Sequence, residues 1–352
     1  SLTEHVDPEP DDILPAGLLL RDRFEIVELV YAAGMSHVYK AIDQRRSTEG
    51  SGDTYVAIKT MRPSIASNDQ GRIALQAEAA KTQSLSHPNI INIYDFDDHD
   101  GQFFLIMEWL DGESVNAMLR RTDGEVVDAD LARKVIRQAA TGVQHAHRNN
   151  VVHADINPSN IFITDTQEIK LLDFGVARFV STSEQAEDDR FTWVTQTYAS
   201  PEVLSGSPPV IEDDVFSLAC VIYRLLKGAH PFGGSPSLVA SQKAVIVERI
   251  PGLADEEWET LRRALSYERS DRPSSVSDFI TWGETTSGVE DSAVQPARRM
   301  MPPLLVWPIA AAAIVALAGG YWLLQGGTVE ESGTPIEPAL PEGTAAAQPV
   351  IS

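Results

Sequence analysis

Short apolar runs dominate the first third of the chain. Residues 24–30 (FEIVELV) alternate loosely between apolar and polar, and residues 55–59 (YVAIK), 90–94 (IINIY) and 103–108 (FFLIME) are further runs of similar length. This pattern predicts four strands. A polar stretch over residues 45–53 separates the first two runs and predicts a long hairpin loop.

Helical spacing replaces the strand pattern in two places. One helix is predicted over about residues 70–85, and most of the chain after residue 111 has the period of a helix. Strands therefore come first and helices second, which favours an α+β fold with a small sheet-rich lobe and a larger helical lobe. We place these lobes at about residues 23–109 and 110–284, followed by a polar linker at residues 285–301.

A long uncharged run near the C-terminus covers residues 300–329. Its core is long enough to cross the roughly 30 Å hydrocarbon layer as a helix. Trp307 lies near one end and Tyr321-Trp322 near the other, as in the aromatic belts of membrane proteins. We therefore predict a transmembrane helix over residues 302–325. A buried soluble helix is the alternative, but core helices rarely run this long without a charge.

Basic residues predict the orientation of this span. Arg298 and Arg299 precede it, and no Lys or Arg follows Arg299. The positive-inside rule then keeps the N-terminal part in the cytoplasm, at the cytoplasmic (inner) membrane. Residues 326–352 are short and polar, so we expect a disordered tail outside the cell membrane. Small residues within the span allow close helix pairing, which is compatible with a homodimer.

The 352-residue chain has a formal net charge of −23 and a pI of about 4.6. Such an acidic surface repels phosphate backbones, so general nucleic-acid binding is excluded. Residues 1–22 open with an acidic, proline-containing stretch that predicts a disordered tail, and no signal peptide is visible there. The single cysteine, Cys220, cannot form an internal disulfide and fits a reducing compartment.

Three short motifs supply a lysine, two carboxylates and an amide side chain. Lys59 ends the run Val56-Ala57-Ile58-Lys59. Asp155 and Asn160 lie five positions apart in a loop between apolar runs, and Asp173 opens the triplet Asp173-Phe174-Gly175. Each motif has an ordinary structural alternative: an exposed lysine, a helix-capping amide or a simple turn. Their joint order and spacing are a much stronger signal than any one of them.

With these motifs the sequence resembles a protein kinase, most closely the membrane-anchored, eukaryotic-like (Hanks-type) serine/threonine kinases of bacteria. The resemblance covers residues 24–282 and includes Ala199-Ser200-Pro201-Glu202, residues 213–219 (DDVFSLA) and Asp271-Arg272-Pro273. It implies a two-lobed kinase domain over residues 23–284, followed by the single transmembrane helix.

The resemblance implies ATP and Mg²⁺ as cofactors, with Mn²⁺ as an alternative metal, and proteins as substrates. Asp155 would orient the acceptor hydroxyl and take its proton, while Lys59, fixed by Glu78, would grip the α- and β-phosphates. Asp173 and Asn160 would hold the metal ions through oxygen atoms. The nucleotide-binding residues implied are Gly34, Val38, Ala57, Lys59, Met107, Glu108 and Leu110.

Other residues fit supporting roles in such a kinase. Thr195 would contact the catalytic Asp, which favours Ser and Thr over Tyr as acceptors. Asp214 would hold the catalytic loop by hydrogen bonds. A buried ion pair and a ring stack are also implied, formed by Glu202 with Arg272 and by His153 with Phe174.

Three departures from the kinase pattern bear on activity. Tyr31 and Ala33 replace the first two glycines of the glycine-rich loop, whose backbone amides normally approach the phosphates. Ala154 replaces an arginine that pairs with a phosphorylated activation segment. Asn157, at a catalytic position, replaces a lysine that neutralises the γ-phosphate, and losing such a charge costs on the order of 10²–10³ in rate.

These departures leave three functional hypotheses. A slow but genuine Ser/Thr kinase is favoured, because Lys59, Asp155, Asn160 and Asp173 are all retained. The alternative is a catalytically impaired pseudokinase that acts as a nucleotide-binding scaffold. A small-molecule phosphotransferase with the same fold is disfavoured by residues 199–202, which would shape a groove for protein substrates.

Overall fold

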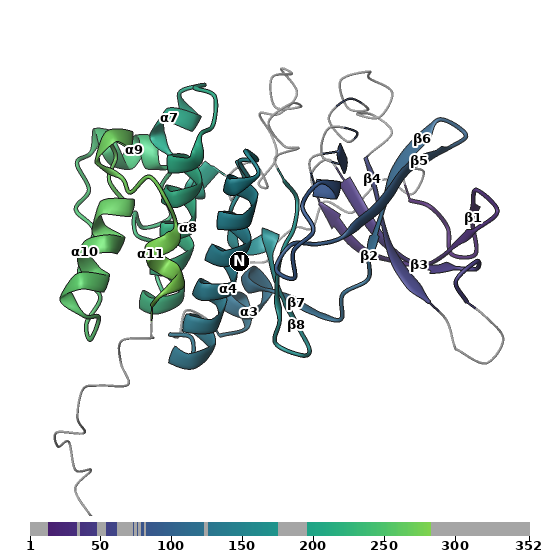
Figure 1. The fold of residues 1–352 in the computed structure, drawn as a ribbon, viewed down its shortest axis with the longest axis horizontal. Coiled ribbons are helices and arrows are strands. Elements are labelled where there is room, and N and C mark those ends of the chain that lie inside the picture. The colour runs from purple at the N-terminus through teal and green to yellow at the C-terminus, as the bar shows by residue number, and fades with distance from the viewer. Residues whose placement is uncertain are drawn as a thin grey trace, which may run out of the picture. The chain divides into compact units, whose positions relative to one another are not determined.

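The computed structural model describes residues 13–33, 36–47, 54–61, 73, 76, 79–80, 82–122, 126–174 and 196–282. All of them belong to one compact unit, Ser1–Val289. Strands occupy the first part of this unit and helices most of the second part, as the hydrophobic pattern predicted (Figure 1). The two-lobed division into a sheet-rich and a helical part is therefore confirmed.

The N-terminal lobe is a six-stranded antiparallel sheet with the order β1-β2-β3-β4-β6-β5. Buried and partly exposed residues alternate along β3, as expected for a strand that packs one face on a core. Tyr39, Ile58 and Phe104 are fully buried in that core. The strands are β1 (Leu19–Leu20), β2 (Phe24–Ala33), β3 (Ser36–Asp43), β4 (Tyr55–Met61), β5 (Ile93–His99) and β6 (Gln102–Glu108).

The edge strand β5 departs from the prediction, which placed a strand over residues 90–94. Ile90 makes only an isolated bridge to Leu171, and the Ile91 N–H donates to the Leu171 carbonyl at 3.0 Å. The strand itself begins at Ile93 and is rich in aspartate. Charged side chains on an edge strand discourage pairing with other chains, so polar composition is compatible with a strand at this position.

A second sheet was not predicted, because the chain after residue 111 was expected to be mostly helical. It joins β7 (Gly112–Ser114), β8 (Ile161–Thr164) and β9 (Ile169–Leu171). Gly112 has a φ of 143°, and a Cβ at this position would lie 2.1 Å from the Ile163 carbonyl oxygen. Only glycine therefore allows β7 to approach β8 so closely.

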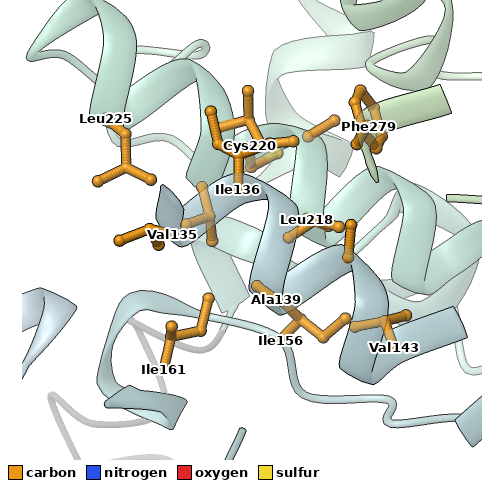
Figure 2. Close-up of a cluster of buried hydrophobic side chains, with 14 of the residues drawn as sticks. Val135, Ile136, Ala139, Val143, Ile156, Ile161, Leu218, Cys220, Leu225 and Phe279 are labelled. Carbon is orange, nitrogen blue, oxygen red and sulfur yellow. The ribbon is translucent and has the colours of Figure 1, made fainter. Parts of the chain in front are cut away.

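Two long helices, α4 (Ala129–Arg148) and α8 (Ile211–Lys227), form the centre of the helical lobe. Asp128 caps α4 by accepting hydrogen bonds from two backbone amides, and Gly228 ends α8 with a φ of 76°. Figure 2 shows Val135 and Ile136 of α4 gathered with Cys220 of α8. The other helices are α3 (Val115–Arg121), α7 (Pro201–Leu204), α9 (Ser237–Gln242), α10 (Asp255–Ala264) and α11 (Ser277–Ile280).

Some predicted segments lie wholly or partly outside the described residues. The span predicted over residues 302–325 is one of them, together with the linker and the tail that flank it. Within the described part of the chain, no helix combines the length and the apolar character needed to cross a bilayer. The helix predicted over residues 70–85 is described only in part, and residues 73, 76, 79–80 and 82–83 are helical.

Candidate active site

Lys59 lies on β4, between the neighbouring strands β3 and β6. Its side chain is 5% exposed, and its Nζ lies 2.8 Å from Asp173 Oδ1. An ammonium group removed from water needs an oxygen partner, which Asp173 supplies here. The fold thus joins two predicted site residues that are 114 positions apart in the sequence.

The apolar side chains predicted to line the adenine pocket share one cluster. Ala57 and Met107 are buried in it, and they are opposite each other across the β4–β6 pair. Val38 and Leu110 pack against the same cluster, as does Leu172, the residue before Asp173. This arrangement provides a nonpolar surface for a flat ring next to the lysine and the carboxylate.

Glu108 ends β6 in the segment expected to bind adenine through its backbone. Its Oε1 accepts hydrogen bonds from Lys170 Nζ and from the Asn92 backbone N–H, each at 2.8 Å. The Glu108 N–H in turn donates to the Asn92 carbonyl at 3.0 Å. Lys170 lies on β9, so this ion pair connects the segment expected to bind adenine with β9. Lys170 and Asn92 could not be predicted from the sequence, because no spacing rule connects them with Glu108.

The catalytic loop is held from below by Asp214 on α8. Its two carboxylate oxygens accept hydrogen bonds from the His153 and Ala154 backbone N–H groups, each at 2.8 Å. The His147 Nε2, from α4, lies 2.7 Å from the same carboxylate. Ala154 has a φ of 66°, a conformation unusual for alanine that these hydrogen bonds help to fix. The role expected of Asp214 is thus visible in its contacts, while His147 was not foreseen.

The ring stack implied by the resemblance is present. The rings of His153 and Phe174 lie 4.3 Å apart between centroids, and both side chains are buried. Burial lowers the pKa of His153, which keeps the imidazole neutral and suited to an apolar stack. The stack connects the catalytic loop directly to the residue after Asp173.

Asp155 carries amide donors on both carboxylate oxygens. Asn157 Nδ2 lies 3.1 Å from Oδ1, and Asn160 Nδ2 lies 2.9 Å from Oδ2. Burial raises the pKa of Asp155 to about 7, because it outweighs the lowering by the hydrogen bonds from Asn157 and Asn160. The nearby charges of Asp173 and Lys59 act in opposite directions. A carboxyl that titrates near neutrality is well matched to proton transfer.

Tyr31 occupies the position of the first glycine of the loop over the phosphates. It lies on β2 opposite Val38, and its side chain is 44% exposed. Partial burial raises the pKa of Tyr31, and the negative charge of Asp173 acts in the same direction. The phenol therefore lies within electrostatic range of the catalytic groups. A glycine at this position would leave that space to the phosphates.

The ion pair expected to brace the substrate-binding segment is part of a larger network. Arg272 Nη2 lies 2.7 Å from Glu202 Oε2, and Arg272 is fully buried at its side chain. Although burial opposes ionisation, the hydrogen bond from Arg272 leaves the pKa of Glu202 lowered. Asp213 binds both Arg272 and Arg269, and it also accepts a hydrogen bond from Ser200 Oγ at 2.7 Å. Asp213 and Arg269 were not assigned this role from the sequence.

Three predicted site residues, Gly34, Glu78 and Thr195, lie outside the described residues. The same holds for residues 175–195, which include most of the hydroxyl side chains of the predicted activation segment. The roles assigned to these residues stay predictions.

The donor set fits a magnesium–nucleotide complex better than a metal held by the protein alone. Among the described side chains, no group of three or more His, Cys, Asp or Glu could hold a metal ion. Asp173 and Asn160 offer oxygen atoms, which are the ligands that Mg²⁺ prefers. The Asn160 amide nitrogen donates to Asp155, which leaves its oxygen as the atom that could serve as a ligand. Phosphate oxygens would complete such a coordination sphere.

The sheet-rich lobe, the helical lobe and the Lys59–Asp173–Asp155 constellation together define the class of protein kinases. The protein kinase domain family matches residues 29–283, and the chain therefore belongs to this family. Its similarity to solved kinase domains supports the same fold. The PknI kinase domain of Mycobacterium tuberculosis covers 79% of this chain and is itself covered completely, with a TM-score of 0.60 and 23% identity. A structure described as the PpkA-294 apo form gives a TM-score of 0.62 at 22% identity, covering 76% of this chain and 99% of its own.

Curated relatives extend the similarity to named bacterial kinases. The serine/threonine-protein kinase PknB of Mycobacterium leprae is 32% identical over 63% of this chain, and PknB of Mycobacterium tuberculosis is 30% identical over 68%. PknA of Mycobacterium tuberculosis is 30% identical over 65% of this chain. The matched region spans only 35%, 38% and 52% of these relatives, respectively.

Proposed function

We propose that this chain is a serine/threonine protein kinase that transfers the γ-phosphoryl group of ATP to protein hydroxyls. The observation that carries the proposal is the convergence of Lys59, Asp173 and Asp155. The 2.8 Å contact between Lys59 Nζ and Asp173 Oδ1 joins the sheet to the predicted metal ligand. Asn160, the second predicted ligand, donates to Asp155 at 2.9 Å. The similarity to relatives named serine/threonine kinases supports Ser and Thr as acceptors.

The residues of this site divide the reaction between them. When bound with ATP, Mg²⁺ would neutralise charge on the phosphates. Lys59 would hold the α- and β-phosphates, and the apolar cluster around Ala57 and Met107 would receive the adenine. Asp155 would accept the proton of the acceptor hydroxyl while the new O–P bond forms and the bond to ADP breaks. Its pKa of about 7 lets it do so at neutral pH.

We also propose that the kinase acts at the cytoplasmic face of the inner membrane. The uncharged run over residues 302–325 and the preceding Arg298-Arg299 pair support one span with the kinase domain inside. Fusing a reporter that is active only outside the cytoplasm to the C-terminus tests this topology. The proposal predicts that the reporter is active when fused to the C-terminus. It predicts no activity when the reporter is fused directly after residue 301, because the span and the tail are then missing.

Phosphoryl transfer can be measured on the full-length chain in detergent, with labelled ATP, Mg²⁺ or Mn²⁺ and a generic acceptor protein. Lys59→Met and Asp155→Asn serve as matched variants. We expect label on serine and threonine with the wild type and almost none with either variant. Equal labelling by all three proteins, or label confined to tyrosine, would contradict the proposal.

A nucleotide-binding pseudokinase is the second candidate, and specific residues favour it. Tyr31 and Ala33 replace loop glycines, Ala154 removes an arginine, and Asn157 removes the cation expected near the γ-phosphate. If ATP raises the unfolding temperature of the wild type without any transfer, this second candidate is correct. The same measurement on Lys59→Met shows whether the nucleotide occupies the predicted site.

A further inference from the structure

We propose that Asn157 is a positioning residue, which holds the carboxylate of Asp155 in place for the acceptor hydroxyl. In the kinase pattern a lysine at this position contacts the phosphate instead. The proposal rests on the proposed kinase function and adds a role for one residue of the same site.

The two amides around Asp155 bind it in the same way. Asn157 Nδ2 donates to Asp155 Oδ1 at 3.1 Å and to the Asp155 backbone carbonyl at 3.2 Å. Asn160 Nδ2 donates to Asp155 Oδ2 and to the same carbonyl, each at 2.9 Å. Because an amide NH₂ group has two hydrogens, each asparagine can satisfy a side-chain and a main-chain oxygen of one residue. The carboxylate is thus fixed at both oxygens.

Asn157 is itself held rigidly enough to act as a support. It is 3% exposed, and its Oδ1 accepts a hydrogen bond from the Ser159 N–H at 2.9 Å. This bond caps the short 3-10 helix Pro158–Asn160, whose last residue is Asn160, the second asparagine that binds Asp155. Both polar ends of the Asn157 side chain are therefore engaged, one on the loop backbone and one on Asp155.

A carboxylate has about four acceptor positions, and the two amides use one on each oxygen. The remaining positions can receive the acceptor hydroxyl, whose O–H bond breaks as its oxygen attacks the γ-phosphorus. Because the proton goes to Asp155, any rotation of this carboxylate would lengthen the proton's path. Correct placement of a base before reaction contributes to rate without a charge on the supporting residue.

The capping role and the positioning role of Asn157 can be separated by substitution. Asn157→Ser keeps an oxygen that can cap the 3-10 helix, but its hydroxyl is too short to reach Asp155 Oδ1 as the amide does. Asn157→Ala removes both contacts. The measurement is the pH dependence of kcat/KM for phosphoryl transfer by the full-length chain, with the unfolding temperature recorded for each protein.

If Asn157 positions Asp155, both variants lose a hydrogen bond that favours the charged carboxylate. The acidic limb of the pH profile then moves to higher pH by about one unit in both, since a hydrogen bond to a charged group has this order of energy. The unfolding temperature of Asn157→Ser stays near that of the wild type. If the pH profile of Asn157→Ser is the same as that of an active wild type, Asn157 only caps the 3-10 helix and the proposal is overturned.

A second readout does not depend on turnover. Carbon-13 NMR of aspartate-labelled full-length protein follows the Asp155 carboxyl directly, with Asp155→Asn identifying its signal. An inactive wild type would overturn the proposed kinase function, yet this titration would still decide the role of Asn157. A higher pKa of Asp155 in Asn157→Ser supports the proposal, and an unchanged pKa refutes it.

Discussion

The catalytic loop and the β2–β3 hairpin flank the same site, but they differ in how much of the kinase pattern they retain. In the loop, Asp155 and Asn160 are present and closely bonded to each other. In the hairpin, Tyr31 and Ala33 stand at two positions where a kinase has glycine. The loop is largely buried and tied to α8 through Asp214, whereas Tyr31 is 44% exposed.

This difference separates two tasks that a kinase must perform. Activating the hydroxyl requires Asp155, whose carboxylate is held by Asn157 and Asn160 although Ala154 and Asn157 depart from the kinase pattern. Gripping the phosphates relies on glycine amides and a lysine near the γ-phosphate, and both have been replaced. Asn157 belongs to the second set by position, yet its contacts place it with the first. We therefore expect this kinase to be weakened in its hold on ATP and in the neutralisation of charge at the γ-phosphate, rather than in proton transfer.

The largest expected effect concerns the buried ion-pair network around Arg272 in the helical lobe. Arg272→Ala would remove the buried partner of Glu202 and one of the two arginines that bind Asp213, which costs about 3–5 kcal/mol of unfolding free energy. Chemical denaturation measures this loss. The matched control is Arg262→Ala, because Arg262 pairs with Glu259 on the exposed face of α10 and should cause no measurable change. Equal stability of the two variants would show that the buried network does not support the site.

Removing the retained cation is the next largest test. Lys59→Met should reduce phosphoryl transfer by about 10²-fold or more, because it removes the charge beside Asp173. Lys40→Met is a suitable comparison, since Lys40 lies on the neighbouring strand and contacts the rings of Tyr55 and Trp109 instead. Its transfer rate at saturating ATP should stay near that of the wild type. A similar loss in both variants would mean that the sheet, and not the Lys59 charge, is responsible.

A third test restores the glycine that the hairpin lacks. Tyr31→Gly should lower the KM for ATP by about tenfold, equivalent to about 1.4 kcal/mol, because the phosphates gain access to the backbone. Tyr31→Phe keeps the ring and should resemble the wild type. The comparison between the two regions would fail if Tyr31→Gly raised the KM instead, since the phenol would then be helping to bind the nucleotide.

The last prediction is a pH dependence of stability. The pKa of Asp155 is raised to about 7 from a model-peptide value of 3.8. The folded protein therefore binds this proton more tightly than the unfolded chain, and stability is lost as the pH rises from about 4 to about 7. Asp155→Asn cannot ionise, so its unfolding temperature should exceed that of the wild type at pH 8.

The difference between the two proteins should depend on pH. Below pH 4 the Asp155 carboxyl is protonated in both states, so the advantage of Asp155→Asn over the wild type should be lost. Repulsion between the new amide and Asn157 or Asn160 does not depend on pH and lowers the unfolding temperature of Asp155→Asn equally across the range. A constant difference across the pH range would show that Asp155 does not titrate as proposed.

Sequence reasoning reached the parts of the site in which chemistry fixes both residue type and spacing. Lys59, Asp155, Asn160 and Asp173 were recognised together because their order and spacing resemble the protein kinase pattern, and the structure gathers all four. The apolar residues Ala57 and Met107 followed from the same resemblance. These features depend on short stretches of sequence that carry their own pattern.

Long-range partners and irregular strands were harder to predict. The Lys170–Glu108 ion pair joins residues 62 positions apart, and no local pattern marks it. Asp213 and Arg269 meet only after α8 has packed. The strand β5 was misplaced because its polar edge residues do not alternate, and β7–β9 were missed because strands of three or four residues have too little periodicity.

The most direct test of this account is single-turnover phosphoryl transfer at saturating ATP, with wild type and Asp155→Asn compared side by side. Saturation removes the weakened hold on ATP from the measurement and leaves the chemical step. We predict clear transfer by the wild type and a rate that is lower by a factor of about 10² or more in Asp155→Asn, as expected for loss of a general base. Absence of transfer by the wild type under these conditions, or equal rates for the two proteins, would contradict the central claim that Asp155 is a working catalytic base.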